Sequence, residues 1–358
     1  MSDFDPERFS RERLKATTRR AMSATSAALV SMRQLQPDKP LPLVVRPAVK
    51  GLELATWAAN NRASIDAALL KHGGILFRDF NVKSAGQFSQ FMRAVTDELL
   101  EYNERSSPRT EVSDNVYTST DYPAAHSIFV HNENSYQRAW PMRIFFYCAT
   151  PADAGGETPI ADCRRVFARL TPRLRERFAE KQWMYVRNFG DGLGLPWETV
   201  FQTTEKAVVE EHCERSGIEA TWKDGGRLRL RAVRPAVRKH PQTGEPVWFN
   251  HATFFHVTTL EREAREVLLA EYADDDLPTN TFYGDGSPIE PEALEELREA
   301  YRRETIVFPW QAGDILLLDN MLAAHGRSPY AGTRKILVGM ADPFGGDAEE
   351  QTGEELTS

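Results

Sequence analysis

The chain has 358 residues, of which 41% are hydrophobic, so it can bury a large core and is not a predominantly disordered protein. Its 52 acidic residues outnumber its 44 lysines and arginines, giving a net charge of −8, which disfavours nucleic acid as a partner because phosphate-binding proteins carry excess positive charge. No apolar run approaches the roughly 20 residues that cross a bilayer, so we expect no membrane association.

The three cysteines, Cys148, Cys163 and Cys213, are odd in number and show no C-x-x-C spacing. This pattern excludes a disulfide scaffold and a cysteine-based zinc site as leading interpretations. The N-terminus lacks an apolar signal-peptide core, so we expect a cytoplasmic protein.

Three regions follow one another along the chain. Residues 1–40, with scattered charge and a weak helical pattern, are predicted to be an N-terminal extension. Residues 41–343 are predicted to form the main domain, which the chain enters through an extended segment at 40–45. Residues 344–358 form an acidic, glycine-bearing tail that we expect to be disordered.

The first part of the main domain alternates helix and strand. A helix is predicted over 53–72, ended by Gly73 and Gly74, and a short apolar strand over 75–80. A capping box at 84–87 predicts a second helix with its apolar residues on one face.

The rest of the domain is rich in short strands. Aromatic strands are predicted over 144–148 and 247–250, and further strands over 306–308, 315–318 and 336–338. Helices are predicted over 163–181, 259–272 and 291–304, and the turn-rich segment 277–286 is predicted to be a mobile lid. Because regular βαβ alternation is absent, we predict a mainly β (α+β) jelly roll with flanking helices.

One short motif carries the chemistry. His131 and Glu133 are two residues apart, so on a strand they point to the same side and can hold one metal ion. His325, just beyond the strong apolar strand at 315–318, is the best candidate for a third ligand. Two histidines and one carboxylate form the facial triad of non-haem Fe(II) oxygenases, which leaves metal positions open. Alone, an H-x-E pattern is more often structural, and the same residues can also hold zinc in a hydrolase.

Several motifs, taken in order, give the chain its resemblance to a known family. They cover residues 40–343 and comprise 74–80 (GILFRDF), 116–123 (VYTSTDYP), 131–136 (HNENSY), 155–158 (GGET), 185–189 (YVRNF), 247–250 (VWFN), 313–320 (GDILLLDN) and 325–327 (HGR) followed by Arg334. In these motifs the chain resembles the TauD/TfdA-type, or clavaminate-synthase-like, Fe(II)/2-oxoglutarate dioxygenases. Within that family it is most similar to the group around the syringomycin-pathway aspartyl hydroxylase.

The resemblance implies a double-stranded β-helix, with Fe(II) and 2-oxoglutarate as cofactors. It implies that His131, Glu133 and His325 are the iron ligands. It also implies that Thr158 and Arg334 hold the distal carboxylate of 2-oxoglutarate, a role that suits the two-pronged guanidinium group. Apart from the resemblance, Thr158 could be only a turn residue, and Arg334 could form a surface salt bridge.

The chain departs from its relatives in two informative ways. The carboxylate ligand is Glu133 rather than the aspartate of the taurine-type members, and its presence argues against halogenation. Val338 stands where some relatives place a substrate-binding arginine, so taurine is a poor fit as substrate. Arg327 is a candidate for substrate contact, with a structural ion pair to Asp314 or Asp319 as the favoured alternative.

Asn250 and His256 are weaker candidates for substrate contact, since they lie in an aromatic stretch that can equally be core. The resemblance implies hydroxylation of an unactivated C–H bond of an amino-acid-like small molecule, either free or tethered to a carrier protein, with release of succinate and CO2. Desaturation or epoxidation by the same cofactors stays open, as do, more distantly, a zinc hydrolase and a non-catalytic jelly-roll module.

Overall fold

The computed structural model describes residues 29–345, except for 101–110, 114, 120, 121, 191 and 193. Most of the predicted N-terminal extension and almost all of the predicted acidic tail lie outside the described residues. The domain boundaries at residues 40 and 343 therefore stay predictions. Among the described helices, none is long and apolar enough to cross a membrane.

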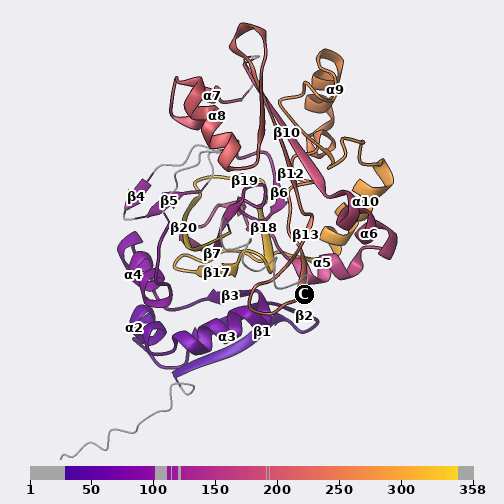
Figure 1. The fold of residues 1–358 in the computed structure, drawn as a ribbon. Helices are drawn as coiled ribbons and strands as arrows, with labels where there is room; N and C mark the ends of the chain where they lie inside the picture. The colour runs from indigo at the N-terminus through magenta and orange to yellow at the C-terminus, as the bar shows by residue number, and fades with distance from the viewer. Residues whose placement is uncertain are drawn as a thin grey trace, which may run out of the picture.

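Two sheets pack face to face at the centre of the molecule (Figure 1). The larger has eight strands, in the spatial order β1 (Val30–Gln36), β2 (Lys39–Pro47), β3 (Gly74–Phe77), β17 (Ile315–Asp319), β7 (Ala139–Thr150), β20 (Lys335–Gly345), β5 (Val116–Thr118) and β4 (Glu111–Ser113). The smaller has four strands, in the order β16 (Thr305–Ile306), β9 (Ile160–Asp162), β18 (Ala323–Arg327) and β6 (Ile128–His131). The predicted jelly-roll architecture, mainly β with flanking helices, is confirmed.

The apolar run at 315–319 forms the middle of the larger sheet. Every residue of β17 is buried, and the strand pairs antiparallel with both β3 and β7. A strand covered on both faces needs a continuous apolar sequence, which explains why this segment was easy to predict. One face of β17 packs against the smaller sheet, through Leu316 and Leu318, and the other packs against helices, through Ile315 and Leu317.

The N-terminal helices α2 (Leu54–Ala59), α3 (Arg62–His72) and α4 (Ala85–Val95) cover the outer face of the larger sheet (Figure 1). The single helix predicted over 53–72 is wrong. The chain breaks at Asn60 and Asn61, whose side-chain amides donate to the carbonyls of Thr56 and Trp57. Asparagine competes in this way with the helical backbone. The predicted end is confirmed, because Gly73 adopts a left-handed conformation with φ +75°.

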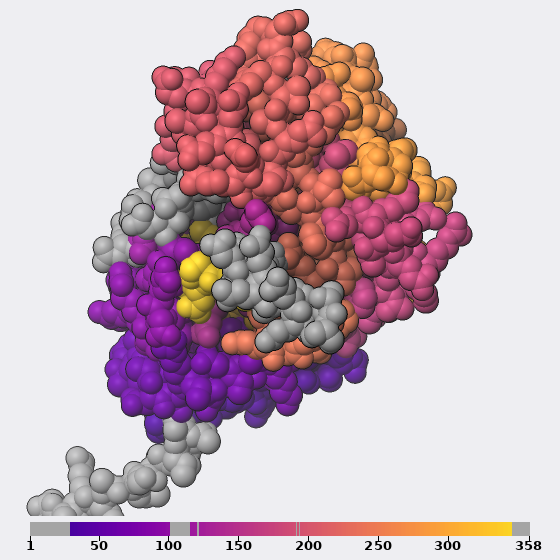
Figure 2. Space-filling model, viewed as in Figure 1, coloured from indigo at the N-terminus to yellow at the C-terminus, as the bar shows by residue number. Residues whose placement is uncertain are grey.

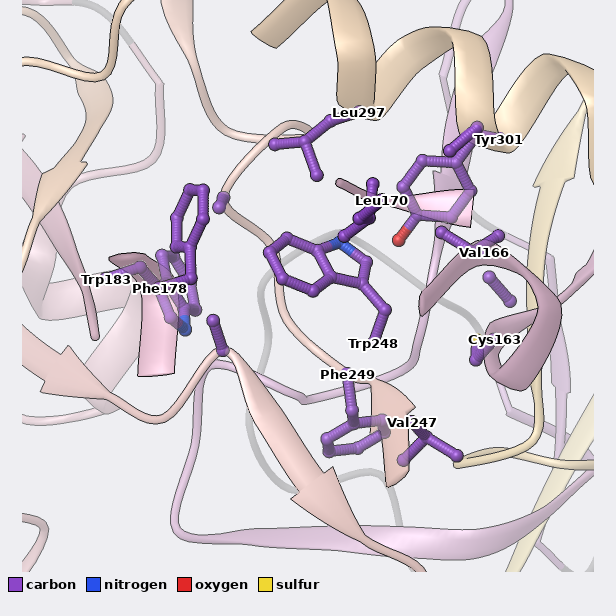
Figure 3. Close-up of a cluster of buried hydrophobic side chains, with 14 of the residues drawn as sticks. Cys163, Val166, Leu170, Phe178, Trp183, Val247, Trp248, Phe249, Leu297 and Tyr301 are labelled. Atoms are coloured by element: carbon purple, nitrogen blue, oxygen red, sulfur yellow. The ribbon is translucent and has the colours of Figure 1, made fainter. Parts of the chain in front are cut away.

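A second layer of helices covers the outer face of the smaller sheet, formed by α5 (Cys163–Arg169), α6 (Pro172–Lys181) and α10 (Pro291–Glu304). In their shared core, Trp248 lies among Phe178, Trp183, Leu297 and Tyr301 (Figure 3). The single helix predicted over 163–181 is wrong, because Pro172 begins a new helix that Thr171 caps.

The remaining elements form a lobe at one end of the molecule, opposite the N-terminal strands and helices (Figure 2). Its sheet has the order β11 (Glu219–Trp222), β12 (Leu228–Arg234), β10 (Trp183–Phe189) and β15 (Thr279–Tyr283). Its helices are α7 (Trp197–Phe201), α8 (Lys206–Arg215), η2 (Asp224–Gly226), η3 (Val257–Thr259) and α9 (Arg262–Glu271). Two small pairs complete the fold, β13 (Val237–Lys239) with β14 (Pro246–Trp248), and β8 (Ala154–Gly155) with β19 (Tyr330–Ala331). The mobile lid predicted over 277–286 is wrong, since its centre is β15, which pairs with β10.

Candidate metal centre

The structure brings together the three residues that the sequence singles out. His131 ends β6, and His325 lies directly opposite it on the antiparallel neighbour β18, with ring centroids 4.7 Å apart. Glu133 follows β6 in a turn, and its Oε2 is 3.7 Å from Nε2 of His325. One ligand atom from each of the three residues lies within 4.8 Å of the others, so the group can hold a single metal ion.

The chemistry of the donor set fits a divalent transition metal. Nδ1 of His131 lies 2.9 Å from the carbonyl oxygen of Phe129, and because a carbonyl only accepts, Nδ1 carries the hydrogen. The unprotonated Nε2 is then the atom available to a metal, an arrangement that metal-binding histidines commonly show. Glu133 and His325 are both buried, at 4% and 5% exposure, so water competes little with an ion bound there.

A buried amide pair holds the turn that carries Glu133. Asn320 accepts from the Glu133 N–H (2.8 Å) and donates to the Glu133 carbonyl (2.9 Å) and to that of Pro141 (2.9 Å). Asn132 donates in return to the Asn320 carbonyl (2.6 Å). Asn320 lies in the turn between β17 and β18, so the same turn supports Glu133 and leads directly into the strand of His325.

A second buried pair, His240 and Asp319, stabilises the same turn between β17 and β18. Nδ1 of His240 accepts from the backbone N–H groups of Gln242 and Thr243, so its Nε2 carries the hydrogen that it donates to Asp319 (3.0 Å). Asp319 in turn accepts from the N–H groups of Met321 and Leu322. Sequence reasoning missed both pairs, although Asp319 and Asn320 belong to a motif that it quoted.

A cavity that is partly open to solvent begins at the two histidines, and its empty space, open mouth included, is about 420 Å³. Its lining comprises Ser119, Ile128, His131, Phe146, Thr158, His325, Gly326, Arg327, Arg334, Ile336 and Val338. Thr158 is buried, and its hydroxyl oxygen accepts from the indole N–H of Trp310 (3.2 Å). Since the indole can only donate, the Thr158 hydroxyl hydrogen is left to donate into the cavity.

Arg334 is one of the two arginines in the cavity lining. Its Nε donates to the Gly156 carbonyl (2.8 Å), which fixes the plane of the guanidinium group. A Cβ on Gly156 would come within 3.0 Å of Arg334 Cδ, and its φ of +73° also favours glycine. Burial, reinforced by the nearby charge of Arg327, lowers the pKa of Arg334 to about 10, so the group stays charged at neutral pH.

Residues 33–341 match the family model described as taurine catabolism dioxygenase TauD, TfdA family. The chain is 40% identical to the dapdiamide synthesis protein DdaC of Enterobacter agglomerans over 318 residues, which cover 86% of this chain and 96% of DdaC. It is 28% identical to a clavaminate synthase-like protein of Arabidopsis thaliana, over 85% of this chain and 94% of that protein.

The chain belongs to the TauD/TfdA family of dioxygenases. This membership confirms the predicted enzyme class, a dioxygenase that uses Fe(II) and 2-oxoglutarate.

Among solved structures, the fold is similar to that of PvcB, described as an Fe, alpha-ketoglutarate dependent oxygenase from an isonitrile synthetic pathway. That likeness has a TM-score of 0.52 at 14% identity, and it covers 87% of this chain and 91% of PvcB.

In this TauD/TfdA protein, Arg327 lies in the cavity wall, where its guanidinium group donates to the carbonyls of Tyr122, Pro123 and His126. The ion pair that the sequence favoured for Arg327 is wrong. Asp314 pairs with Arg78 at 2.6 Å, and Asp319 pairs with His240. Arg327 therefore anchors the 122–126 segment to the strand of His325.

The other two substrate candidates lie outside the cavity lining. Both amide atoms of Asn250 bind backbone, donating to the Ala236 carbonyl and accepting from the Ala252 N–H. His256 caps η3, with Nδ1 accepting from the Thr258 N–H, and burial lowers the pKa of His256 to about 4. A substrate role for Asn250 and His256 stays a prediction without support from these contacts.

The aromatic segment 251–256, which the sequence predicted to be pocket-lining or core, forms a wall of rings against His131. Phe254 and His251 have ring centroids 4.5 Å and 5.5 Å from that of His131. His251 is buried, Nδ1 lies 2.5 Å from the Ser135 hydroxyl, and burial holds the pKa of His251 well below its ordinary value. Tyr136 and Phe255 pack against His251, at 5.1 and 4.6 Å. The concentration of histidine and aromatic residues in 251–256 was the sequence signal for this wall of rings.

Proposed function

We propose that this dioxygenase hydroxylates an unactivated C–H bond of an amino-acid-derived small molecule in a natural-product pathway, releasing succinate and CO2. The proposal includes His131, Glu133 and His325 as the ligands of Fe(II). It also includes Arg334 and Thr158 as the residues that hold the distal carboxylate of 2-oxoglutarate. The observation that carries it is the His131, Glu133 and His325 cluster, whose two histidines line one cavity together with the guanidinium group of Arg334.

The residues that line the cavity suit a dicarboxylate. Arg334 offers a planar, charged donor pair, and the Thr158 hydroxyl adds a further donor, so a carboxylate there gains charge-assisted hydrogen bonds. Iron with 2-oxoglutarate supplies the activation of dioxygen for C–H oxidation. The protein binds, orients and excludes water: Phe146 lies against the His325 ring, with centroids 5.0 Å apart, and apolar Ile336 and Val338 line the same space.

The substrate class rests on the similarity to DdaC, whose name places that protein in dapdiamide synthesis. Val338 in the cavity lining supports the exclusion of taurine, because it offers no charge to a sulfonate. A carrier protein as partner and a cytoplasmic location belong to the proposal as well. The described cysteines are free thiols buried in the structure, which agrees with a reducing compartment.

The first test is anaerobic addition of Fe(II) and 2-oxoglutarate to the metal-free protein, followed by visible spectroscopy for the charge-transfer band of the chelate. We expect a band in the wild type, none in His131→Ala, and a band in Arg334→Ala only at much higher 2-oxoglutarate concentration. Candidate amino-acid derivatives are then screened for stimulated oxygen uptake and succinate release. Bound metal without a band would overturn the proposal and bring forward a zinc hydrolase.

A further inference from the structure

The lobe sheet carries arginines on both faces, and they differ in their partners. In the register of β10 and β12, Val186 lies opposite Arg231 and Asn188 opposite Arg229, so these side chains share one face. Both arginines on that face are ion-paired: Arg231 with Asp275 at 2.6 Å, and Arg229 with the acidic groups of the same segment. Arg187 lies opposite Leu230, on the other face.

Arg187 lacks the acid partners of its neighbours. Its guanidinium carbon lies 4.5 Å from the centroid of the Phe189 ring. Over the residues that the structure describes, no carboxylate forms an ion pair with it. The side chain is only half-buried, so an incoming anion can reach it. Arg187 is therefore a positioned cation on the inner face of the sheet that the protein itself does not neutralise.

That inner face connects to the metal centre through stacked rings. Tyr185, two residues before Arg187 on the same face, stacks on Phe255 with centroids 5.1 Å apart. Phe255 packs on His251, and His251 packs on the metal-centre residue His131. Figure 1 shows β10 standing in the lobe above the strands β6 and β18 that carry the two histidines. The chain of ring contacts therefore runs from His131 to the sheet face that carries Arg187.

We propose that the ring wall formed by Tyr136, Tyr185, His251, Phe254 and Phe255 is the substrate subsite, and that Arg187 binds an anionic group of the substrate. The inference rests on the proposed function. It adds the charge of the substrate and the direction in which the substrate extends from the metal centre. Rings bury the flat or apolar part of a ligand, while the guanidinium pairs with a carboxylate or phosphate in two-pronged fashion.

Two sources can supply that anion. A free amino-acid derivative offers its carboxylate, and a carrier-tethered substrate offers the phosphate of a pantetheine arm. Binding is measured by titration calorimetry on protein loaded with Mn(II) and 2-oxoglutarate, which takes up ligands without turnover. One probe pair is N-acetyl-L-asparagine and its carboxamide, and the other is pantetheine 4′-phosphate and pantetheine. The members of the first pair differ in the charge of one group of similar shape, and the members of the second differ in the presence of the phosphate.

We expect one charged probe to bind the wild type at least tenfold more tightly than its neutral counterpart, and Arg187→Met to abolish that difference. Arg187→Lys should keep part of it, and Arg231→Met, which removes an ion-paired arginine from the neighbouring strand, should keep all of it. The pair that shows the effect identifies a free acid or a carrier arm.

Equal binding of charged and neutral probes to the wild type would overturn the proposal, as would a preference that survives Arg187→Met or Arg187→Gln. The binding of 2-oxoglutarate is measured first on every variant and should be unchanged by the Arg187 substitutions. Failure of the wild type to bind 2-oxoglutarate would instead overturn the proposed function. The two failures can therefore be distinguished.

Discussion

Removing the Asn320 side chain should weaken metal binding without touching any ligand residue. In Asn320→Ala the Glu133 turn loses the acceptor of its N–H and the donor to its carbonyl, and the Pro141 carbonyl loses its donor. Asn320 is fully buried, so water cannot readily replace these bonds. The carboxylate of Glu133 then rests on a turn with fewer constraints.

Two magnitudes follow from these contacts. A hydrogen bond contributes a net stability of about 0.5–1.5 kcal/mol, so losing three should lower the free energy of unfolding of the metal-free protein by about 2–4 kcal/mol. Removing the partners that orient metal ligands typically costs about 10–100-fold in metal affinity, and we expect a loss in that range for Fe(II) or Mn(II).

The assay compares Asn320→Ala with a matched control, Asn188→Ala. Asn188 also makes three hydrogen bonds, donating to the carbonyls of Asp275 and Leu277 and accepting from Arg229. Urea denaturation of the metal-free proteins gives the stability loss, and Mn(II) titration gives the affinity. The control should lose stability but bind the metal normally.

An Asn320→Ala protein that binds Mn(II) as tightly as the wild type would refute the reasoning. So would an equal loss of affinity in Asn188→Ala, because the effect would then reflect general destabilisation rather than the support of Glu133.

Three further outcomes are expected. Arg334→Ala should weaken 2-oxoglutarate binding about 30-fold or more while leaving Mn(II) affinity unchanged, because one partner of a buried charge pair is lost; calorimetry measures both. The pKa of His251 is lowered on folding, so the unfolded chain takes up the additional proton below about pH 6.5. The metal-free protein should therefore lose stability as the pH falls from 6.5, less steeply in His251→Gln, and urea midpoints at pH 7.5 and 5.5 test this; an equal slope in both proteins would contradict it. Trp248→Ala, in a fully buried core position, should cost about 3–5 kcal/mol of unfolding free energy, against less than 1 kcal/mol for the exposed Val267→Ala.

Elements with strong local signals were predicted well from the sequence. The helix at 291–304 has a proline at its first turn and matches α10, and the apolar run at 315–318 matches β17. Local chemistry also decided the errors, since Asn60 and Asn61 divide one predicted helix and Pro172 divides another. Both breaks were visible in the sequence, as an Asn-Asn pair and a proline inside the predicted helices.

The segment 277–286 shows a different kind of error. Its glycines and proline indicate turns, and the prediction of a lid followed from them. Thr279–Tyr283 nevertheless forms β15 because β10 offers an open edge for pairing. A strand edge supplied by residues almost a hundred positions away leaves no trace in local composition.

The sequence by itself determined the family, the three candidate metal ligands and the apolar strand β17 that precedes His325, because these depend on residue identity and short-range spacing. Only the tertiary structure decided that His131 and His325 are neighbours across β6 and β18, since pairing over so long a separation depends on how the sheets close. The tertiary structure also decided which contacts the surrounding polar residues make. Arg327 binds backbone instead of a carboxylate, Asn320 holds Glu133, and Arg187 lies on the sheet face without acids. Each of these depends on which groups the fold buries together, and burial is a property of the packed chain rather than of any segment.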